Sequence, residues 1–109
     1  MKELNWLGSS LADVKKFDVD ARREIGYQLD KVQNGLEPSD WKPMNIVALG
    51  VREIRVHTDT ESRVLYVAKF ADTVHVLHAF TKKSQKTEQR DVDIAKRRFA
   101  KLVNERLLK

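Results

Sequence analysis

Several residue types that build specialised sites are missing from this chain. Its 109 residues include no cysteine, which excludes disulfide bonds and thiolate metal sites and is compatible with a reducing compartment. No apolar run is long enough to span a membrane or to form a signal peptide, so we expect a cytoplasmic protein with no membrane partner. The motifs of P-loop, dinucleotide-binding, zinc-protease and serine-hydrolase sites are also absent.

The bulk composition indicates a folded protein. Hydrophobic residues make up 41% of the chain and charged residues 34%, a balance typical of globular rather than disordered proteins. A chain of this length supports one modest core, so we expect a single domain over residues 1–109.

The net charge of +5 is concentrated near the end of the sequence. Residues 82–109 hold ten Lys and Arg against four Asp and Glu, whereas residues 1–81 hold eleven against twelve. Such a concentration favours a polyanionic partner, because cations that bind phosphates displace their counterions. A solvated helix face is the alternative interpretation.

Apolar periodicity predicts two helices in the first third of the chain. Ser10, with Asp13 three residues later, is typical of the N-cap of a short helix. Asp18 is a second N-cap candidate, before a helix of about four turns that Gly35 would end. The apolar stripe of this helix comprises Ala21, Ile25, Leu29, Val32 and Leu36. Residues 37–44 contain both prolines and predict a loop.

From Val51 the apolar period becomes that of strands. Residues 51–58, 62–70 and 73–80 are rich in β-branched and aromatic side chains, and their short connections predict an antiparallel meander. Residues 2–7 are a weaker candidate for a further strand. A C-terminal helix follows, with an apolar stripe of Val92, Ala95, Phe99 and Leu102. The order predicts an α+β domain, in which two N-terminal helices and a basic C-terminal helix pack on an antiparallel sheet of three or four strands.

The strand pattern predicts which side chains share a face of the sheet, because directly paired antiparallel residues point to the same side. A turn near Thr60 pairs His57 with Arg63 and Arg55 with Leu65. The face of Arg63 is then expected to hold Arg55, His57, Leu65, Val67, Val76, His78 and Phe80. The opposite face, with the main core under the helices, is expected to hold Ile54, Val56, Val64, Tyr66, Ala68, Phe70, Leu77 and Ala79.

Cations converge on the first of these faces. The strand that carries His78 runs directly into Lys82 and Lys83, near the expected positions of Arg55 and Arg63. A single exposed cation on a sheet is common and indicates no function by itself. Several cations from three strands instead predict a phosphate-binding site that works without a metal ion.

The histidines and carboxylates do not form a metal-binding pattern. His75 and His78 are three residues apart on one strand, so they point to opposite faces. Helix capping and the helix dipole account for the paired acidic residues Asp18, Asp20, Asp91 and Asp93. We therefore expect neither a metal nor another cofactor.

Four segments together resemble a known family. They read G-V-x-E-I-R from Gly50, R-x-x-Y-x-x-K from Arg63, V-L-H-A-F-x-K-K-x-x-K-T from Val76 and A-x-R-R from Ala95. With similar features upstream, they make nearly the whole chain similar to the RelE/HigB-type toxins of bacterial and phage type II toxin–antitoxin systems, particularly the phage-derived HigB-like branch. The strand-to-helix motif is the most specific part of this resemblance.

The resemblance implies a RelE-like fold and a small ribonuclease that enters the ribosomal A site and cuts messenger RNA. Its partner would be a neutralising antitoxin, commonly a helix-turn-helix protein. The family's strand arginine corresponds to Arg63, the basic residue of the preceding strand to Arg55, and the cations after the last strand to Lys82 and Lys83. The best-known members carry an arginine at the position of Lys83 and a tyrosine shortly after it, which this chain lacks. His78 and Lys82 are therefore candidates for the acid and the base.

On this hypothesis, the RNA 2′-OH attacks the adjacent phosphate without a metal, while cations stabilise the developing charge. The expected catalytic residues are Arg63, His78, Lys82 and Lys83. The expected RNA-binding residues are Arg55, His57, Lys86, Arg90, Lys96, Arg97 and Arg98. The alternatives are a gyrase-directed ParE-like toxin and a non-catalytic binding module of the same fold.

Overall fold

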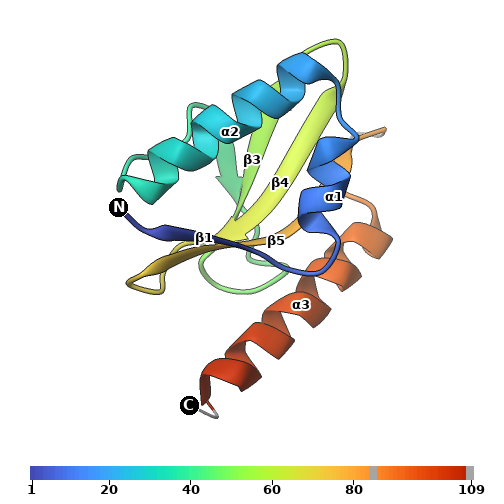
Figure 1. Ribbon diagram of the computed structural model, residues 1–109. Helices are drawn as coiled ribbons and strands as arrows, with labels where there is room; N and C mark the ends of the chain where they lie inside the picture. Colours follow the sequence, from blue (N-terminus) through green and yellow to red (C-terminus); the bar gives the residue numbers. More distant parts are fainter. Residues whose placement is uncertain (84–85, 108–109) are drawn as a thin grey trace.

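Period-two alternation in the second half of the chain produces the three longest strands of a five-stranded sheet (Figure 1). The computed structural model describes residues 1–83 and 86–107. The strands are β1 (Glu3–Trp6), β2 (Trp41–Pro43), β3 (Val51–His57), β4 (Glu61–Val67) and β5 (Thr73–Thr81). The helices are α1 (Ser10–Lys15), α2 (Val19–Gln33) and α3 (Gln89–Leu107). The predicted α+β class is confirmed.

The strands lie in the order β1-β5-β4-β3-β2. β3, β4 and β5 form the predicted antiparallel meander, but β1 lies parallel to β5, so the prediction of an all-antiparallel sheet is wrong. The long stretch of chain between β1 and β5 permits this parallel pairing. The sheet also has five strands rather than three or four, because β2 forms within the predicted loop at residues 37–44. Pro43 is compatible with β2 because this strand lies at the sheet edge.

The helix ends follow from local chemistry. Asp18 caps α2, since its Oδ1 accepts a 2.8 Å hydrogen bond from the backbone N–H of Ala21. Gly35 has a φ of 80°, the left-handed conformation that commonly ends a helix. The N-cap of α1 is Ser9 rather than Ser10, and the Ser9 hydroxyl donates to the Asp13 carboxylate over 2.8 Å. No helix within residues 1–83 and 86–107 is both long and apolar enough to cross a membrane.

Helices cover both faces of the sheet, so the core has two parts (Figure 1). Under α1 and α2, the sheet contributes Ile54, Val56, Val64, Tyr66, Val74, Val76 and Ala79. Under α3, it contributes Val51, Leu65, Val67 and Leu77, which pack against Val92, Ala95 and Leu102 of the helix. The face predicted to expose basic side chains is therefore partly covered by α3.

The pairing of β3 with β4 differs from the prediction by two residues. Arg55 pairs with Arg63, and His57 pairs with Glu61. Because side chains alternate along a strand, a shift of two residues leaves Arg55, His57 and Arg63 on one face, as predicted. These three side chains therefore share one face of the sheet even though the predicted register was wrong.

A register irregularity between Leu65 and Tyr66 changes the faces of β5. Val76 packs under α1 and α2, whereas Leu77 packs under α3, so both residues lie on the face opposite to the predicted one. Phe70 likewise packs with the α3 core rather than the α2 core. Strict alternation fails here because the irregularity lets one strand carry an extra residue relative to its partner.

Candidate functional site

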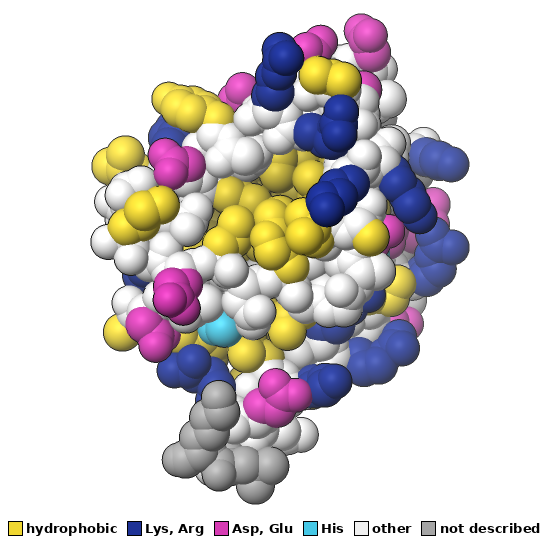
Figure 2. Space-filling view, viewed as in Figure 1, with side chains coloured by type: hydrophobic (Ala, Val, Ile, Leu, Met, Phe, Trp, Pro, Cys, Tyr) yellow, Lys and Arg dark blue, Asp and Glu magenta, His cyan; other side chains and the backbone are white. Residues whose placement is uncertain are grey.

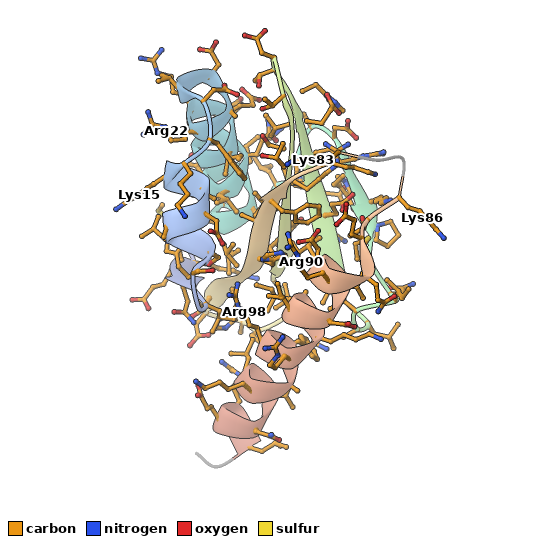
Figure 3. All side chains as sticks on the ribbon, turned by 90° about the vertical axis from the view of Figure 1, so that its right-hand side faces the viewer. Lys15, Arg22, Lys83, Lys86, Arg90 and Arg98 are labelled. Atoms are coloured by element: carbon orange, nitrogen blue, oxygen red, sulfur yellow. The ribbon has the colours of Figure 1, made fainter. Side chains whose placement is uncertain are left out.

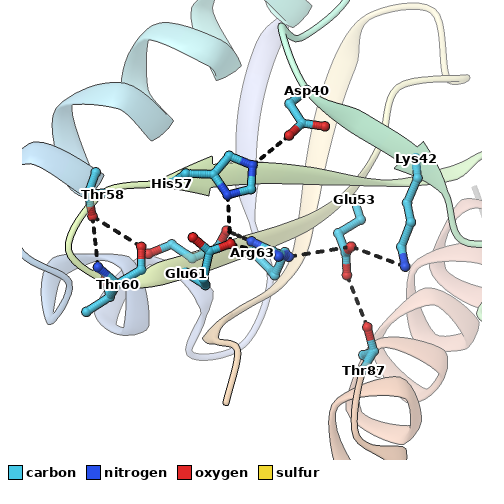
Figure 4. Close-up of polar contacts among 10 residues, drawn as sticks. Asp40, Lys42, Glu53, His57, Thr58, Thr60, Glu61, Arg63 and Thr87 are labelled. Carbon is cyan, nitrogen blue, oxygen red and sulfur yellow. Dashed lines mark hydrogen bonds and ion pairs between the residues drawn. The ribbon is translucent and has the colours of Figure 1, made fainter. Parts of the chain in front are cut away.

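A buried carboxylate lies among cations on the face of the sheet that α3 partly covers (Figure 4). Glu53 has no solvent exposure, and its Oε1 lies 3.8 Å from both Lys42 Nζ and Arg63 Nε. Its Oε2 accepts a 3.2 Å hydrogen bond from the Thr87 hydroxyl. A buried charge needs compensating partners, and here cations from β2 and β4 provide them.

Four cations define what we call the cation cluster: Lys42, Arg55, Arg63 and Lys82. Strand alternation places the first three on one face, since Lys42 pairs with Glu53, and Arg55 pairs with Arg63. Lys82 follows β5 and interacts electrostatically with Glu53 and with the other three cations. Their mutual repulsion in the absence of a bound anion is offset by the Glu53 carboxylate, which acts as an internal anion.

Arg63 is held from three sides and is only 4% exposed. One terminal nitrogen donates to the Ser62 carbonyl over 3.0 Å, and the other donates to Glu61 Oε1 over 3.2 Å. Its Nε faces Glu53. A phosphate that binds this guanidinium directly must therefore compete with Glu61, whereas the positive charge of Arg63 acts on the site without any rearrangement.

The surroundings of Lys82 disfavour the protonated form of its side chain. Burial lowers the pKa of its ammonium group, and the charges of Arg63, Lys42 and Arg55 lower it further. Glu53 opposes them and raises the pKa, but the net shift is downward. A lysine with a lowered pKa is a stronger acid than an ordinary lysine, which suits acid–base chemistry.

His78 lies on the same face but is enclosed, with 5% exposure. Its Nε2 lies 2.7 Å from Asp91 Oδ1, and its ring stacks on Phe80 with centroids 5.3 Å apart. The other ring nitrogen is buried, and no group among the residues that the structure describes forms a hydrogen bond with it. Asp91, which we attributed to helix capping, is a buried partner of this histidine. The predicted proton acceptor is thus shielded from solvent.

An open groove of about 490 Å³ lies at the end of β5. We call it the β5 groove. It is lined by Phe80, Thr81, Lys82, Lys83, Lys86, Glu88, Arg90 and Asp91. Figure 3 shows Lys83, Lys86 and Arg90 on one side of the molecule. The structure therefore brings together the catalytic candidates Lys82 and Lys83 and the RNA-binding candidates Lys86 and Arg90.

Other predicted RNA-binding residues lie apart from this groove. Lys96 and Arg97 are exposed on α3. Arg98 donates to the Leu77 carbonyl over 2.9 Å and to the Ser9 hydroxyl over 3.0 Å, so its guanidinium joins α3 to β5 and the start of α1.

His57 is also engaged by protein groups. Its ring nitrogens lie 2.7 Å from carboxylate oxygens of Asp40 and Glu61 (Figure 4). The hydrogen bond to Asp40, followed by that to Glu61, raises the pKa of this histidine. Because Glu61 also accepts from Arg63, His57 is linked to the cation cluster through that carboxylate.

Sequence reasoning missed Glu53 and Lys42. Alternation along residues 51–57 places Glu53 on the face of Arg55, so the signal for it was present in the strand pattern. Lys42 belongs to a three-residue strand in a predicted loop, and no periodicity could have revealed its orientation. Across residues 1–83 and 86–107, no group of three or more histidine or acidic side chains is arranged to hold a metal ion.

Comparisons with known proteins agree with the resemblance in the motifs. A search of curated proteins gives no match. The family model described as "Phage derived protein Gp49-like (DUF891)" matches residues 12–100, which span α2, β2 to β5 and the first part of α3. Gp49-like proteins are a RelE/HigB-like toxin family of toxin–antitoxin systems. The chain belongs to this Gp49-like family.

Proposed function

We propose that this protein is a ribosome-dependent endoribonuclease that cuts messenger RNA in the ribosomal A site, without a metal ion. It acts in the cytoplasm, and its neutralising partner is an antitoxin with a helix-turn-helix domain. Membership of the toxin family supports the class of function. The observation that carries the chemical part is the cation cluster with its internal carboxylate, next to an open basic groove.

The proposed reaction is a transesterification within the RNA. The 2′ oxygen forms a bond to the adjacent phosphorus, the bond from phosphorus to the 5′ oxygen breaks, and a cyclic phosphate and a 5′ hydroxyl result. The 2′ proton leaves to a base, and an acid protonates the departing oxygen. Charge on the phosphorane is stabilised by the guanidinium groups of Arg63 and Arg55.

Lys82 is the proposed proton donor to the departing 5′ oxygen. Its lowered pKa makes it a stronger acid than an ordinary lysine, and it lies at the boundary of the cation cluster and the β5 groove. Exposed Lys83 contacts the same phosphate. His78 can accept the 2′ proton only after Phe80 moves off its ring, so its proposed role requires a side-chain rearrangement.

Exposed cations next to the groove support a role in RNA binding. Lys86 and Arg90 line the groove itself, and Lys96 and Arg97 extend the positive surface along α3. Their contribution is electrostatic and independent of sequence, because phosphates are the common feature of all RNA.

The test is Lys82→Met, which removes the ammonium group and keeps an aliphatic side chain. In a translation reaction, primer extension should show loss of cleavage by roughly a hundredfold or more, the usual contribution of a positioned acid. Lys101→Met, at an exposed position on α3, is the matched control and should retain cleavage. Undiminished cleavage by folded Lys82→Met would reject the assignment, and supercoiling defects without new 5′ ends would identify a gyrase-directed toxin instead.

A further inference from the structure

A second groove, of about 470 Å³, lies between α1 and α3. We call it the α1–α3 groove. It shares Phe80, Thr81, Arg90 and Asp91 with the β5 groove. Four shared lining residues make the two grooves neighbours along the end of β5. The region from Lys83 to α1 is therefore one continuous surface.

We propose that the two grooves form a single track for single-stranded RNA, in which the α1–α3 groove binds nucleotides that flank the reacting phosphate. This inference rests on the proposed function, because it takes the β5 groove as the place of reaction. It adds α1 to the RNA-binding surface, with Lys16 as the principal new contact.

The charges along the α1–α3 groove favour a polyanion. Its lining contains three cations, Lys16, Arg90 and Arg98, and two carboxylates, Asp13 and Asp91. Both carboxylates are already engaged, since Asp91 lies against His78 and Asp13 accepts from Ser9. Within residues 1–83 and 86–107, neither Lys16 nor Arg90 forms an ion pair with an acidic side chain. These two cations have their charge available for phosphates.

The views of the molecule agree with a basic track at this place. Figure 2 shows Lys and Arg side chains gathered along the right-hand side of the molecule. That side faces the viewer in Figure 3, where Arg90 and Arg98 lie between Lys83 and the helix α1. Arg90 lines both grooves and so occupies the middle of the track.

Aromatic side chains distinguish this track from a purely electrostatic surface. Phe80 lies where the two grooves meet, and Phe17 lines the α1–α3 groove; both are partly exposed. Single-stranded nucleic acids bind where a cationic groove follows the backbone and aromatic rings stack on the bases. The combination favours an RNA strand over an acidic polypeptide, which has no bases to stack.

The test compares a short and a long RNA on the full chain. Fluorescence anisotropy would measure binding of 2′-O-methyl oligouridylate, which cannot be cleaved, as a tetranucleotide and as a dodecanucleotide. We expect Lys16→Glu to weaken binding of the dodecanucleotide at least fivefold and to leave the tetranucleotide unchanged. The salt dependence for the long RNA should flatten, by a slope of about 0.7 for each phosphate that the variant no longer neutralises.

Lys15→Glu is the matched control, because it introduces the same charge one residue away on α1. Lys15 does not line the groove and points away from it in Figure 3. Its effect should be small and equal for both RNAs. Equal effects of Lys15→Glu and Lys16→Glu, or equal losses for both RNA lengths, would overturn the proposal. So would a loss of poly-glutamate binding in Lys16→Glu without loss of the dodecanucleotide, which would indicate an acidic peptide.

Failure of the track and failure of the ribonuclease give different results. A wild-type protein that cleaves in translation but binds both RNA lengths equally rejects the track alone. A protein that shows the length-dependent effect of Lys16→Glu but does not cleave rejects the ribonuclease and supports the track.

Discussion

The two faces of the sheet bury their residues in different ways. The face under α1 and α2 is filled mainly by aliphatic and aromatic side chains, and Ser62, a polar side chain that the sheet buries there, is uncharged. The face towards α3 is apolar beneath the helix, but beside it Glu53, Arg63 and His78 are buried as polar groups. Hydrophobic burial stabilises a fold directly, whereas a buried ion pair contributes little net stability. We therefore expect substitutions among these polar residues to affect the proposed chemistry more than substitutions on the apolar face do.

Adjacent residues on β3 allow the two faces to be compared at one position. Ile54 and Glu53 are both fully buried and point to opposite faces. Ile54→Ala should lower the free energy of unfolding by about 2–5 kcal/mol, because it removes buried aliphatic volume. Urea denaturation measures this loss. Cleavage per folded molecule should remain that of the wild type, and a selective loss of cleavage would show that the apolar face also supports the chemistry.

Glu53→Gln should have a smaller effect on stability and a larger effect on function. We expect the free energy of unfolding to fall by about 1–3 kcal/mol, since buried donors lose their charged acceptor. RNA binding should tighten, because the internal anion no longer competes with phosphate. The pH profile of cleavage should move to lower pH, since Glu53 is the group that raises the pKa of Lys82. An unchanged affinity together with an unchanged pH profile would show that Glu53 only fills space.

The same comparison explains what could be predicted from the sequence. The apolar stripes of the helices and the three-strand meander follow from the spacing of apolar residues, which shows which face of each element is buried. The exchange of Val76 and Leu77 between faces depends on one irregularity in β4–β5 pairing, and periodicity does not encode it. The cations of the strand-to-helix motif were predicted as site residues because positive charge is concentrated there, and four of them line one groove. Glu53 and Asp91 were missed as site residues because their importance arises from burial against partners distant in sequence.

Asp91→Asn tests whether the buried His78 takes part in the reaction or only in the packing of the core. The change keeps a hydrogen-bonding group beside His78 but removes its charge. We expect a loss of about 0.5–1.5 kcal/mol in the free energy of unfolding, the usual net value of one hydrogen bond. Cleavage should fall less than in Lys82→Met, because His78 is enclosed by Phe80. A larger fall in the folded variant would instead identify His78 as the base.

The smallest effect is expected at the solvent-exposed edge of the polar face, where His57 bridges two carboxylates. Hydrogen bonds to Asp40 and then to Glu61 raise its pKa above the ordinary value of 6.5. Its stabilising contribution is therefore complete below the unfolded-state pKa and is lost as the pH rises through the higher folded-state pKa. His57→Gln should lower the urea midpoint at about pH 5.5 and have little effect at about pH 8.5. The side chain is 51% exposed, so the difference should be small and should shrink in high salt. A difference that persists unchanged at alkaline pH would mean that His57 acts through packing, and the charged link from His57 through Glu61 to Arg63 would then be unnecessary for stability.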